Sequence, residues 1–177
     1  CSLSAATRAK YDEAVRLHLL KLINSSKISS IACYQAFNGE PDIAPLCRQL
    51  HTRGYELALP VVSGHNDHAM QFHAWHAKTT LAKNRYCILE PRGTGAVPVS
   101  EFDMLIMPLV GYDRFGNRLG MGSGYYDRHL ESLRGLDLPL RVGVAYSLQE
   151  IELIRKNNWD IPLHGIVNEH GWFTFVH

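Results

Sequence analysis

The segment spanning residues 105–130 constrains the fold and the function of this chain more than any other. It reads LIMPLVGYDRFGNRLGMGSGYYDRHL, an apolar run with the composition of a buried strand, followed by a loop rich in glycine and arginine. Gly120, Gly122 and Gly124 permit a sharp turn in which backbone N–H groups approach a ligand closely. A helix that begins after this loop would add its free amides and the positive end of its dipole. The segment therefore predicts a phosphate-binding site.

Charged side chains around the glycine loop fit this interpretation. Arg114, Arg118 and Arg128 surround the loop, and a guanidinium offers a planar fork of donors to phosphate oxygens. Asp113 and Asp127 are carboxylates that can hold a divalent cation against the same oxygens. The spacing matches neither the P-loop nor the Rossmann fingerprint. A purely structural turn with solvated arginines is therefore the alternative interpretation.

Length and composition predict one soluble globular domain. The chain has 177 residues, of which 46% are hydrophobic and 20% are charged. A formal net charge of +1 gives no nucleic-acid footprint, and no apolar run is long enough to span a membrane. The N-terminal residues lack the pattern of a signal peptide, and four cysteines without C-x-x-C spacing favour reduced thiols. We expect a cytoplasmic monomer whose partners are small molecules, with no nucleic acid and no membrane.

Four histidines crowd into a short segment and raise the question of a metal site. His65 and His68 fall in a polar loop, whereas His73 and His76 fall in or beside an expected strand. The period of two along a strand places His73 and His76 on opposite faces, where they cannot chelate one ion. We therefore expect solvated or packed histidines rather than a zinc site.

Hydrophobic periodicity predicts alternating strands and helices. Ser4 can cap a helix to about Asn24, and Ser147 with Glu150 has the spacing of a capping box for a helix to about Lys156. Helices are also expected over residues 43–53 and 124–134, strands over 29–35, 57–62, 70–76, 105–110 and 141–146, two short antiparallel edge strands at 166–167 and 172–176, and mostly loop over 77–98. The β-α-β order indicates parallel pairing. The predicted fold is α/β, a single-domain, three-layer, open and mostly parallel sheet with helices on both faces, Rossmann-like.

A second group of residues could line a pocket for a flat ring. Glu40 follows a turn at the carboxyl end of the first expected strand, where ligands bind in open α/β sheets. Its alternative role is that of an acid at a helix start, favoured by the helix dipole. The apolar and aromatic candidates, for which core packing is the alternative, are Phe37, Met70, Phe72, Trp75 and Tyr86.

The run GNRLGMGSGYYDR over residues 116–128, preceded by Tyr112-Asp113, resembles the signature of the 5-formyltetrahydrofolate cyclo-ligase family, also called 5,10-methenyltetrahydrofolate synthetases. Weaker resemblance covers nearly the whole chain, including FNGEPD at 37–42, YCILEP at 86–91 and WDIPL at 159–163. The resemblance implies an enzyme that uses ATP and Mg²⁺ to convert 5-formyltetrahydrofolate to 5,10-methenyltetrahydrofolate, releasing ADP and phosphate. The formyl oxygen would attack the γ-phosphate, and N10 of the folate would then close on the formyl carbon. Sugar-phosphate isomerases and CoA-transferases share this type of scaffold.

The resemblance also implies roles for individual residues. Arg118 and Tyr125 would be catalytic, and Asp127 would bind Mg²⁺. The residues expected to contact ATP are Arg118, Leu119, Gly120, Met121, Gly122, Ser123, Gly124, Tyr125 and Tyr126. The residues expected to contact the folate are Gln35, Phe37, Glu40, Met70, Tyr86, Met121, Gly122, Ser123, Gly124 and Tyr125. Residues 1–177 would form one domain of this family.

The sequence departs from the family pattern at three places. Members carry a basic N-terminal helix that contacts ATP, and Arg8, Lys10 and Arg16 do not match it, so we expect that helix to be lacking. Ser123 stands where some members have lysine, and His164 stands where many have an aspartate assigned to magnesium. These departures motivate the alternative of a non-catalytic nucleotide- or folate-binding homologue. A different enzyme on a similar α/β scaffold is a further alternative, because a fold alone does not decide a function.

Overall fold

The computed structural model describes residues 3–62, 70–122, 124–157 and 159–175. Its central sheet contains, in spatial order, β12 (Gly171–Thr174), β11 (Gly165–Asn168), β10 (Leu140–Val144), β7 (Met104–Pro108), β1 (Ser30–Ala32), β2 (Glu56–Val62), β3 (Met70–Trp75) and β6 (Ala96–Val97). The five strands from β11 to β2 pair in parallel. Strands β12, β3 and β6 pair antiparallel with their neighbours. The prediction of a mostly parallel sheet with an antiparallel edge is confirmed.

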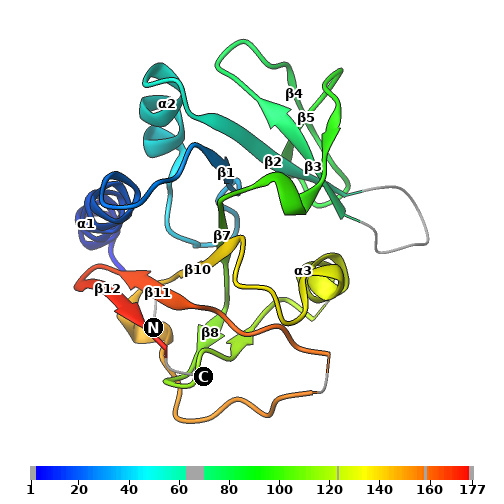
Figure 1. The fold of residues 1–177 in the computed structure, drawn as a ribbon. Helices are drawn as coiled ribbons and strands as arrows, with labels where there is room; N and C mark the ends of the chain where they lie inside the picture. Colours follow the sequence, from blue (N-terminus) through cyan, green and yellow to red (C-terminus); the bar gives the residue numbers. More distant parts are fainter. Residues whose placement is uncertain (1–2, 63–69, 123, 158, 176–177) are drawn as a thin grey trace.

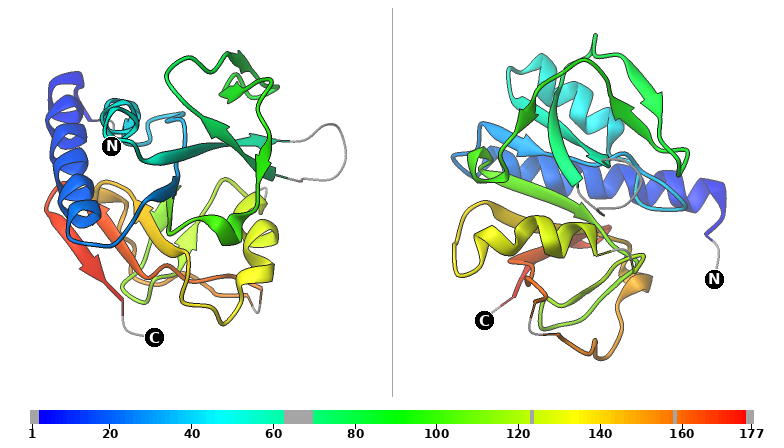
Figure 2. Two further views of the ribbon diagram at one scale, coloured as in Figure 1. Left: turned by 45° about the horizontal axis from the view of Figure 1, so that its top comes forward. Right: turned by 90° about the vertical axis from the view of Figure 1, so that its right-hand side faces the viewer.

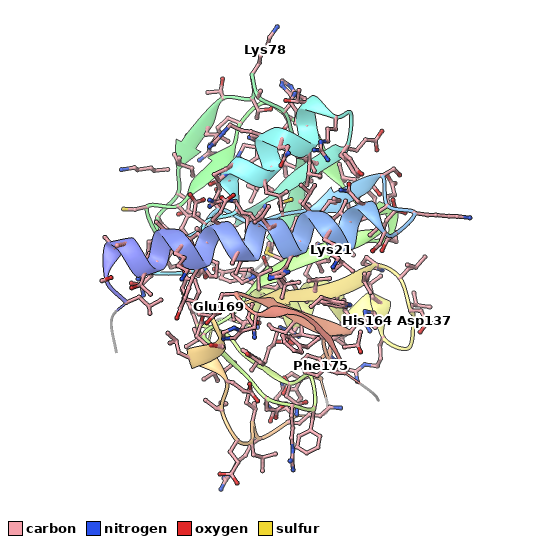
Figure 3. The ribbon with its side chains drawn as sticks, turned by 90° about the vertical axis from the view of Figure 1, so that its left-hand side faces the viewer. Lys21, Lys78, Asp137, His164, Glu169 and Phe175 are labelled. Atoms are coloured by element: carbon pink, nitrogen blue, oxygen red, sulfur yellow. The ribbon has the colours of Figure 1, made fainter. Side chains whose placement is uncertain are left out.

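Helices cover both faces of this sheet. The helices α1 (Ala5–Asn24) and α2 (Ala44–Thr52) lie on one face, and α3 (Tyr125–Leu130) lies on the other (Figures 1 and 2). Seen from its own side, α1 runs across the molecule with α2 beside it (Figure 3). The hydroxyl of Ser4 accepts a hydrogen bond from the N–H of Thr7 at 3.1 Å, which confirms the predicted cap. Two apolar cores result, one on each face, and the three-layer α/β prediction is confirmed.

No helix in the described ranges has both the length and the apolar character needed to cross a membrane.

The region from residue 77 to 98 is mostly loop and turn, as expected, but it also contains three short strands that the sequence did not indicate. A hairpin forms from β4 (Leu81–Lys83) and β5 (Leu89–Pro91), and β6 joins the main sheet. Strands of two or three residues are too short to show a period of two. Tertiary hydrogen bonds replace the missing pattern, because buried Glu90 accepts from the N–H of Val62 at 2.8 Å and from Nδ2 of Asn84 at 2.6 Å.

The prediction of a helix after residue 146 is wrong. Only a 3-10 turn forms, over Ser147–Gln149. The side chain of Gln149 accepts from the N–H of Tyr146 at 2.7 Å. The amide of Ile151 then donates to the carbonyl of Tyr112 at 2.9 Å. The Ile151 amide, which a helix would use internally, is therefore bound to the hairpin formed by β8 (Gly111–Tyr112) and β9 (Arg118–Leu119).

The amino ends of β1 and β7 are joined by the carboxylate of Asp103. Its Oδ2 accepts from the N–H of Ser29 at 2.7 Å, the hydroxyl of Ser29 at 2.9 Å and the N–H of Ser30 at 3.0 Å. The hydrogen bond from the Ser29 amide is the largest of the effects that hold the pKa of Asp103 below its usual range, and these hydrogen bonds outweigh partial burial. One side chain thus sets the start of two adjacent parallel strands.

We expect Asp103→Asn to lower the free energy of unfolding by about 1–3 kcal/mol at neutral pH, because hydrogen bonds to a charged acceptor are weakened. The folded-state pKa of Asp103 lies below its unfolded value, so its contribution is present above roughly pH 4 and is lost as the pH falls through the folded-state pKa. Urea unfolding of the wild type and the variant at several pH values should show the difference shrinking in acid. The exposed Glu152→Gln is the control. A difference that does not change with pH would contradict this assignment.

Candidate active site

A cavity of about 420 Å³ opens at the carboxyl end of the parallel strands. Residues that follow β1, among them Gln35 and Phe37, form part of its wall, and Pro108 at the end of β7 forms another part. The volume lies in the range typical of small-molecule sites. Ligands of open α/β sheets bind at this edge, so the cavity is the candidate active site.

Of the residues predicted to bind ligands, Phe72 and Trp75 pack in the apolar cores, and Asp113, Arg114 and Arg128 also do not line this cavity. Those that the family resemblance assigned to ATP, the folate or Mg²⁺ do line it wherever the structure describes them. They are Gln35, Phe37, Glu40, Met70, Tyr86, Arg118, Leu119, Gly120, Met121, Gly122, Gly124, Tyr125, Tyr126 and Asp127. Ser123 lies outside the described residues. The fold therefore brings the glycine loop and the expected ring-binding residues, which are distant in the sequence, to a single cavity.

The glycine loop needs glycine at two positions for reasons of backbone geometry. Gly122 has φ +85° and Gly124 has φ +61°, in the left-handed region that side chains disfavour. A Cβ on Gly124 would also lie 3.1 Å from Nη1 of Arg128. The helix that follows is shorter than the predicted span of residues 124–134, because α3 has six residues and continues as the 3-10 turn Glu131–Leu133. Its dipole adds correspondingly little to the loop.

Arg118 and Asp127 form an ion pair on the cavity wall. Nη2 of Arg118 donates to Oδ1 of Asp127, and Nη1 donates to the carbonyl of Ile161. The two side chains are only 7% and 26% exposed, so their charges interact with little screening by solvent. The residue predicted to bind phosphate and the residue predicted to bind Mg²⁺ are thus adjacent and neutralise each other.

Asp113, expected from the sequence to bind a cation, has a different environment. Its side chain is 0% exposed, and Oδ1 accepts from the N–H groups of Phe115 at 2.9 Å and Asn117 at 3.0 Å. Oδ2 accepts from Nδ2 of Asn117 and the N–H of Ile154, both at 2.9 Å. Burial raises the pKa of Asp113, but hydrogen bonds led by that of Asn117 outweigh it and lower the pKa overall. Both oxygens are occupied, which favours a structural role over cation binding.

The segment held by Asp113 supplies cavity residues that sequence reasoning missed. Ile154, Arg155, Asn157, Trp159 and Asp160 all line the cavity. Trp159 is 61% exposed, and a large exposed aromatic side chain is typical of a binding surface. Its position in the run WDIPL was the one available signal.

Glu40 occupies a desolvated part of the cavity wall. Its Oε2 accepts from the N–H of Phe37 at 2.9 Å, closing a turn in which Asn38 and Gly39 both have positive φ. Burial raises the pKa of Glu40 to about 7, against the opposing effect of the Phe37 hydrogen bond. Because α2 begins only at Ala44, Glu40 is not a helix-start acid. It can therefore donate or accept a hydrogen bond near neutral pH.

The β4–β5 hairpin forms a further wall and meets α3 at the cavity mouth. Oδ1 of Asn84, a residue not predicted from the sequence, accepts from the N–H of Tyr86 at 2.8 Å and of Ile88 at 3.0 Å. The hydroxyls of Tyr86 and Tyr125 are 3.1 Å apart. Figure 1 shows the hairpin and α3 on the same side of the sheet. Two aromatic residues predicted separately are thus in direct contact.

The histidines do not form a metal centre in the described part of the chain. Nδ1 of His73 donates to the carbonyl of Thr94 at 2.7 Å, while His65 and His68 lie outside the described residues. Among described residues, no group of three or more His, Cys, Asp and Glu side chains suits a metal ion. Cys33 and Cys47 are buried free thiols, as predicted.

His164, one of the departures noted in the sequence, is not among the residues that line the cavity. Its ring lies against Arg141, with Nδ1 2.9 Å from the backbone nitrogen and Nε2 3.0 Å from Nη2. Figure 3 shows His164 near Asp137, at the end of β11 opposite Glu169. His164 therefore lies between β10 and β11, where its ring contacts Arg141.

Comparison with known proteins agrees with this fold. The sequence model of the 5-formyltetrahydrofolate cyclo-ligase family matches residues 2–169. A 5-formyltetrahydrofolate cyclo-ligase of Haemophilus influenzae is 33% identical over 168 residues, covering 94% of this chain and 89% of the relative. One from Escherichia coli (strain K12) is 37% identical over 140 residues, covering 78% and 76%.

Solved structures show the same relationship. The 5,10-methenyltetrahydrofolate synthetase of Aquifex aeolicus superposes with a TM-score of 0.84 at 33% identity, covering 99% of this chain and 86% of that one. The 5,10-methenyltetrahydrofolate synthetase of Mycoplasma pneumoniae, at 24% identity and a TM-score of 0.75, shows the shared fold over 95% of this chain and 90% of its own. The family match, the curated relatives and the fold agree, and this chain belongs to the 5-formyltetrahydrofolate cyclo-ligase family.

Proposed function

We propose that this protein converts 5-formyltetrahydrofolate to 5,10-methenyltetrahydrofolate, with hydrolysis of ATP to ADP and phosphate in the presence of Mg²⁺. The observation that carries the proposal is one cavity with two chemically different walls. A glycine loop with an Arg118–Asp127 pair forms one wall, and Glu40 with Tyr86 forms another. This arrangement suits two reactants that must meet, an anionic phosphate donor and a flat heterocycle.

The glycine loop would hold the ATP phosphates. Backbone N–H groups of residues 120–122 and 124–126 and the guanidinium of Arg118 would supply donors where negative charge develops during phosphoryl transfer. Asp127 would bind Mg²⁺, which commonly takes one or two carboxylates together with phosphate oxygens. Binding would replace the Arg118–Asp127 ion pair by two new pairs of opposite charge, so neither side chain becomes an unpaired charge.

The chemistry needs positioning and charge neutralisation. The formyl oxygen attacks the γ-phosphorus, forming an O–P bond as the bond to ADP breaks. N10 then attacks the formyl carbon, loses its proton, and the C–O bond to phosphate breaks to leave the methenyl bridge. Tyr125 follows the glycine loop, and its backbone would border the formyl group, while its hydroxyl faces that of Tyr86 at the cavity mouth. Glu40 would hydrogen-bond the pterin ring at the other wall.

The direct test is the absorbance of the methenyl product when the protein is mixed with 5-formyltetrahydrofolate, ATP and Mg²⁺. We expect product only when all three are present, with one phosphate released per methenyl group formed. Calorimetric titration with each substrate runs in parallel. Binding of ATP or folate without product would contradict the proposal and favour the non-catalytic homologue.

Arg118→Ala should lower kcat/KM by about 10²–10³-fold, because a preorganised cation near the transferring phosphate is removed. The far-ultraviolet circular dichroism should stay unchanged. Arg114→Ala is the matched control, since Arg114 is exposed, contacts the ring of Phe115 at 4.8 Å and does not line the cavity. Equal rates for the Arg118 variant and the wild type would mean that phosphate binds elsewhere.

Affinity for the folate should rise with pH if the ionised carboxylate of Glu40 accepts hydrogen bonds from the pterin. With a pKa of about 7, the ionised fraction of Glu40 rises roughly tenfold between pH 6 and pH 8. The Kd should fall by a similar factor over this range. Glu40→Gln, measured by the same titration, should bind more weakly at pH 8 and show a flat profile. A pH dependence that persists in Glu40→Gln would assign it to another group.

A further inference from the structure

Arg85 places a positive charge at the mouth of the cavity, in the hairpin between β4 and β5. Its Nη2 donates to the hydroxyl of Tyr125 at 2.9 Å, and its guanidinium carbon lies 4.9 Å from the centroid of the Tyr86 ring. Both tyrosines line the cavity. Within the part of the chain that the structure describes, Arg85 forms no ion pair with a carboxylate. Its charge is therefore held in place without being neutralised there.

The two tyrosines orient this guanidinium for a ligand. The hydrogen bond from Arg85 to the Tyr125 hydroxyl raises the pKa of Arg85, so the side chain is charged throughout the working pH range. A guanidinium carries five N–H donors in a planar fork that matches a carboxylate. Because contacts with Tyr86 and Tyr125 already order the side chain, binding an anion costs less conformational entropy than at a free arginine.

A reduced folate is a long molecule with its negative charge at one end. The pterin and the formyl group lie at the head, the aminobenzoyl group follows, and a glutamyl tail carries two carboxylates. If the head contacts Glu40 and the glycine loop, the tail must leave through the mouth, where Tyr86 is 38% exposed. Arg85, beside Tyr86, is then a cation on the path of the tail.

We propose that Arg85, supported by Tyr86 and Tyr125, binds a carboxylate of the glutamyl tail of the formyl folate. The proposal rests on the proposed function and adds a separate subsite to it. ATP phosphates are the other anions that the cavity would receive, and Arg118, which pairs with Asp127 in the expected ATP site, is the cation assigned to them. The Arg85 subsite would thus increase affinity for folates through their glutamyl tail and not through the reacting formyl group.

The test combines a variant of the protein with a variant of the ligand. The wild type and Arg85→Ala are each measured with 5-formyltetrahydrofolate and with the analogue in which both tail carboxylates are primary amides. Dissociation constants come from calorimetry, and KM and kcat come from the methenyl absorbance. Arg92→Ala, another exposed arginine near this hairpin that does not line the cavity, is the matched control.

We expect Arg85→Ala to raise the Kd and KM for the acid by about three- to tenfold, and those for the diamide by less than about twofold. The effect on the acid should weaken at high salt. Equal effects on both ligands would show that Arg85 acts through Tyr125, and a raised KM for ATP alone would assign the anion to phosphate; either result overturns the proposal. If the wild type binds folate without turnover, the proposed function fails while the dissociation constants still decide this subsite. Absence of folate binding by the wild type overturns both.

Discussion

The cavity depends on one buried carboxylate, that of Asp113, which receives four hydrogen bonds from two segments of the chain. Three come from the β8–β9 turn, which leads into Arg118 and the glycine loop. The fourth comes from Ile154, the first of the cavity residues in the C-terminal segment. A buried carboxylate is stable only when its oxygens accept hydrogen bonds. The burial of Asp113 therefore requires these four donors to stay in place. Asp113 thereby fixes the position of the glycine-loop wall relative to the wall formed by the segment from Ile154 onward.

Charges within the cavity are balanced by neighbouring groups of opposite charge, not by a large net charge of the protein. The formal net charge is only +1, yet the site has a half-buried Arg118–Asp127 pair and a Glu40 whose pKa lies near 7. These groups can take a polyanion, a divalent cation and a heterocycle without leaving a charge unpaired. The proposed reaction suits a site with balanced charges, because a phosphoryl group passes between two bound ligands and the protein mainly positions them.

Sequence reasoning predicted the sheet and the glycine loop because both depend on local signals. Apolar runs indicated the inner strands, Ser4 indicated the start of α1, and the signature from Gly116 to Arg128 indicated the family. It failed for the β4–β5 hairpin and for the segment after Gln149. There the backbone follows tertiary hydrogen bonds, some to partners about forty residues away, which leave no periodic pattern. The structural roles of Asp103 and Asp113 were missed for the same reason.

The most direct measurement is amide hydrogen exchange in the variant Asp113→Asn. An amide at this position keeps one acceptor oxygen but directs an NH₂ group toward donors that now bond to Oδ2, including the N–H of Ile154. Losing a hydrogen bond to a charged acceptor costs about 1.5–3 kcal/mol, so exchange of the Ile154 amide should accelerate at least tenfold. Amides of β7 should exchange as in the wild type. Unchanged protection of Ile154, or equal acceleration across the whole sheet, would contradict the conclusion that Asp113 joins the two walls.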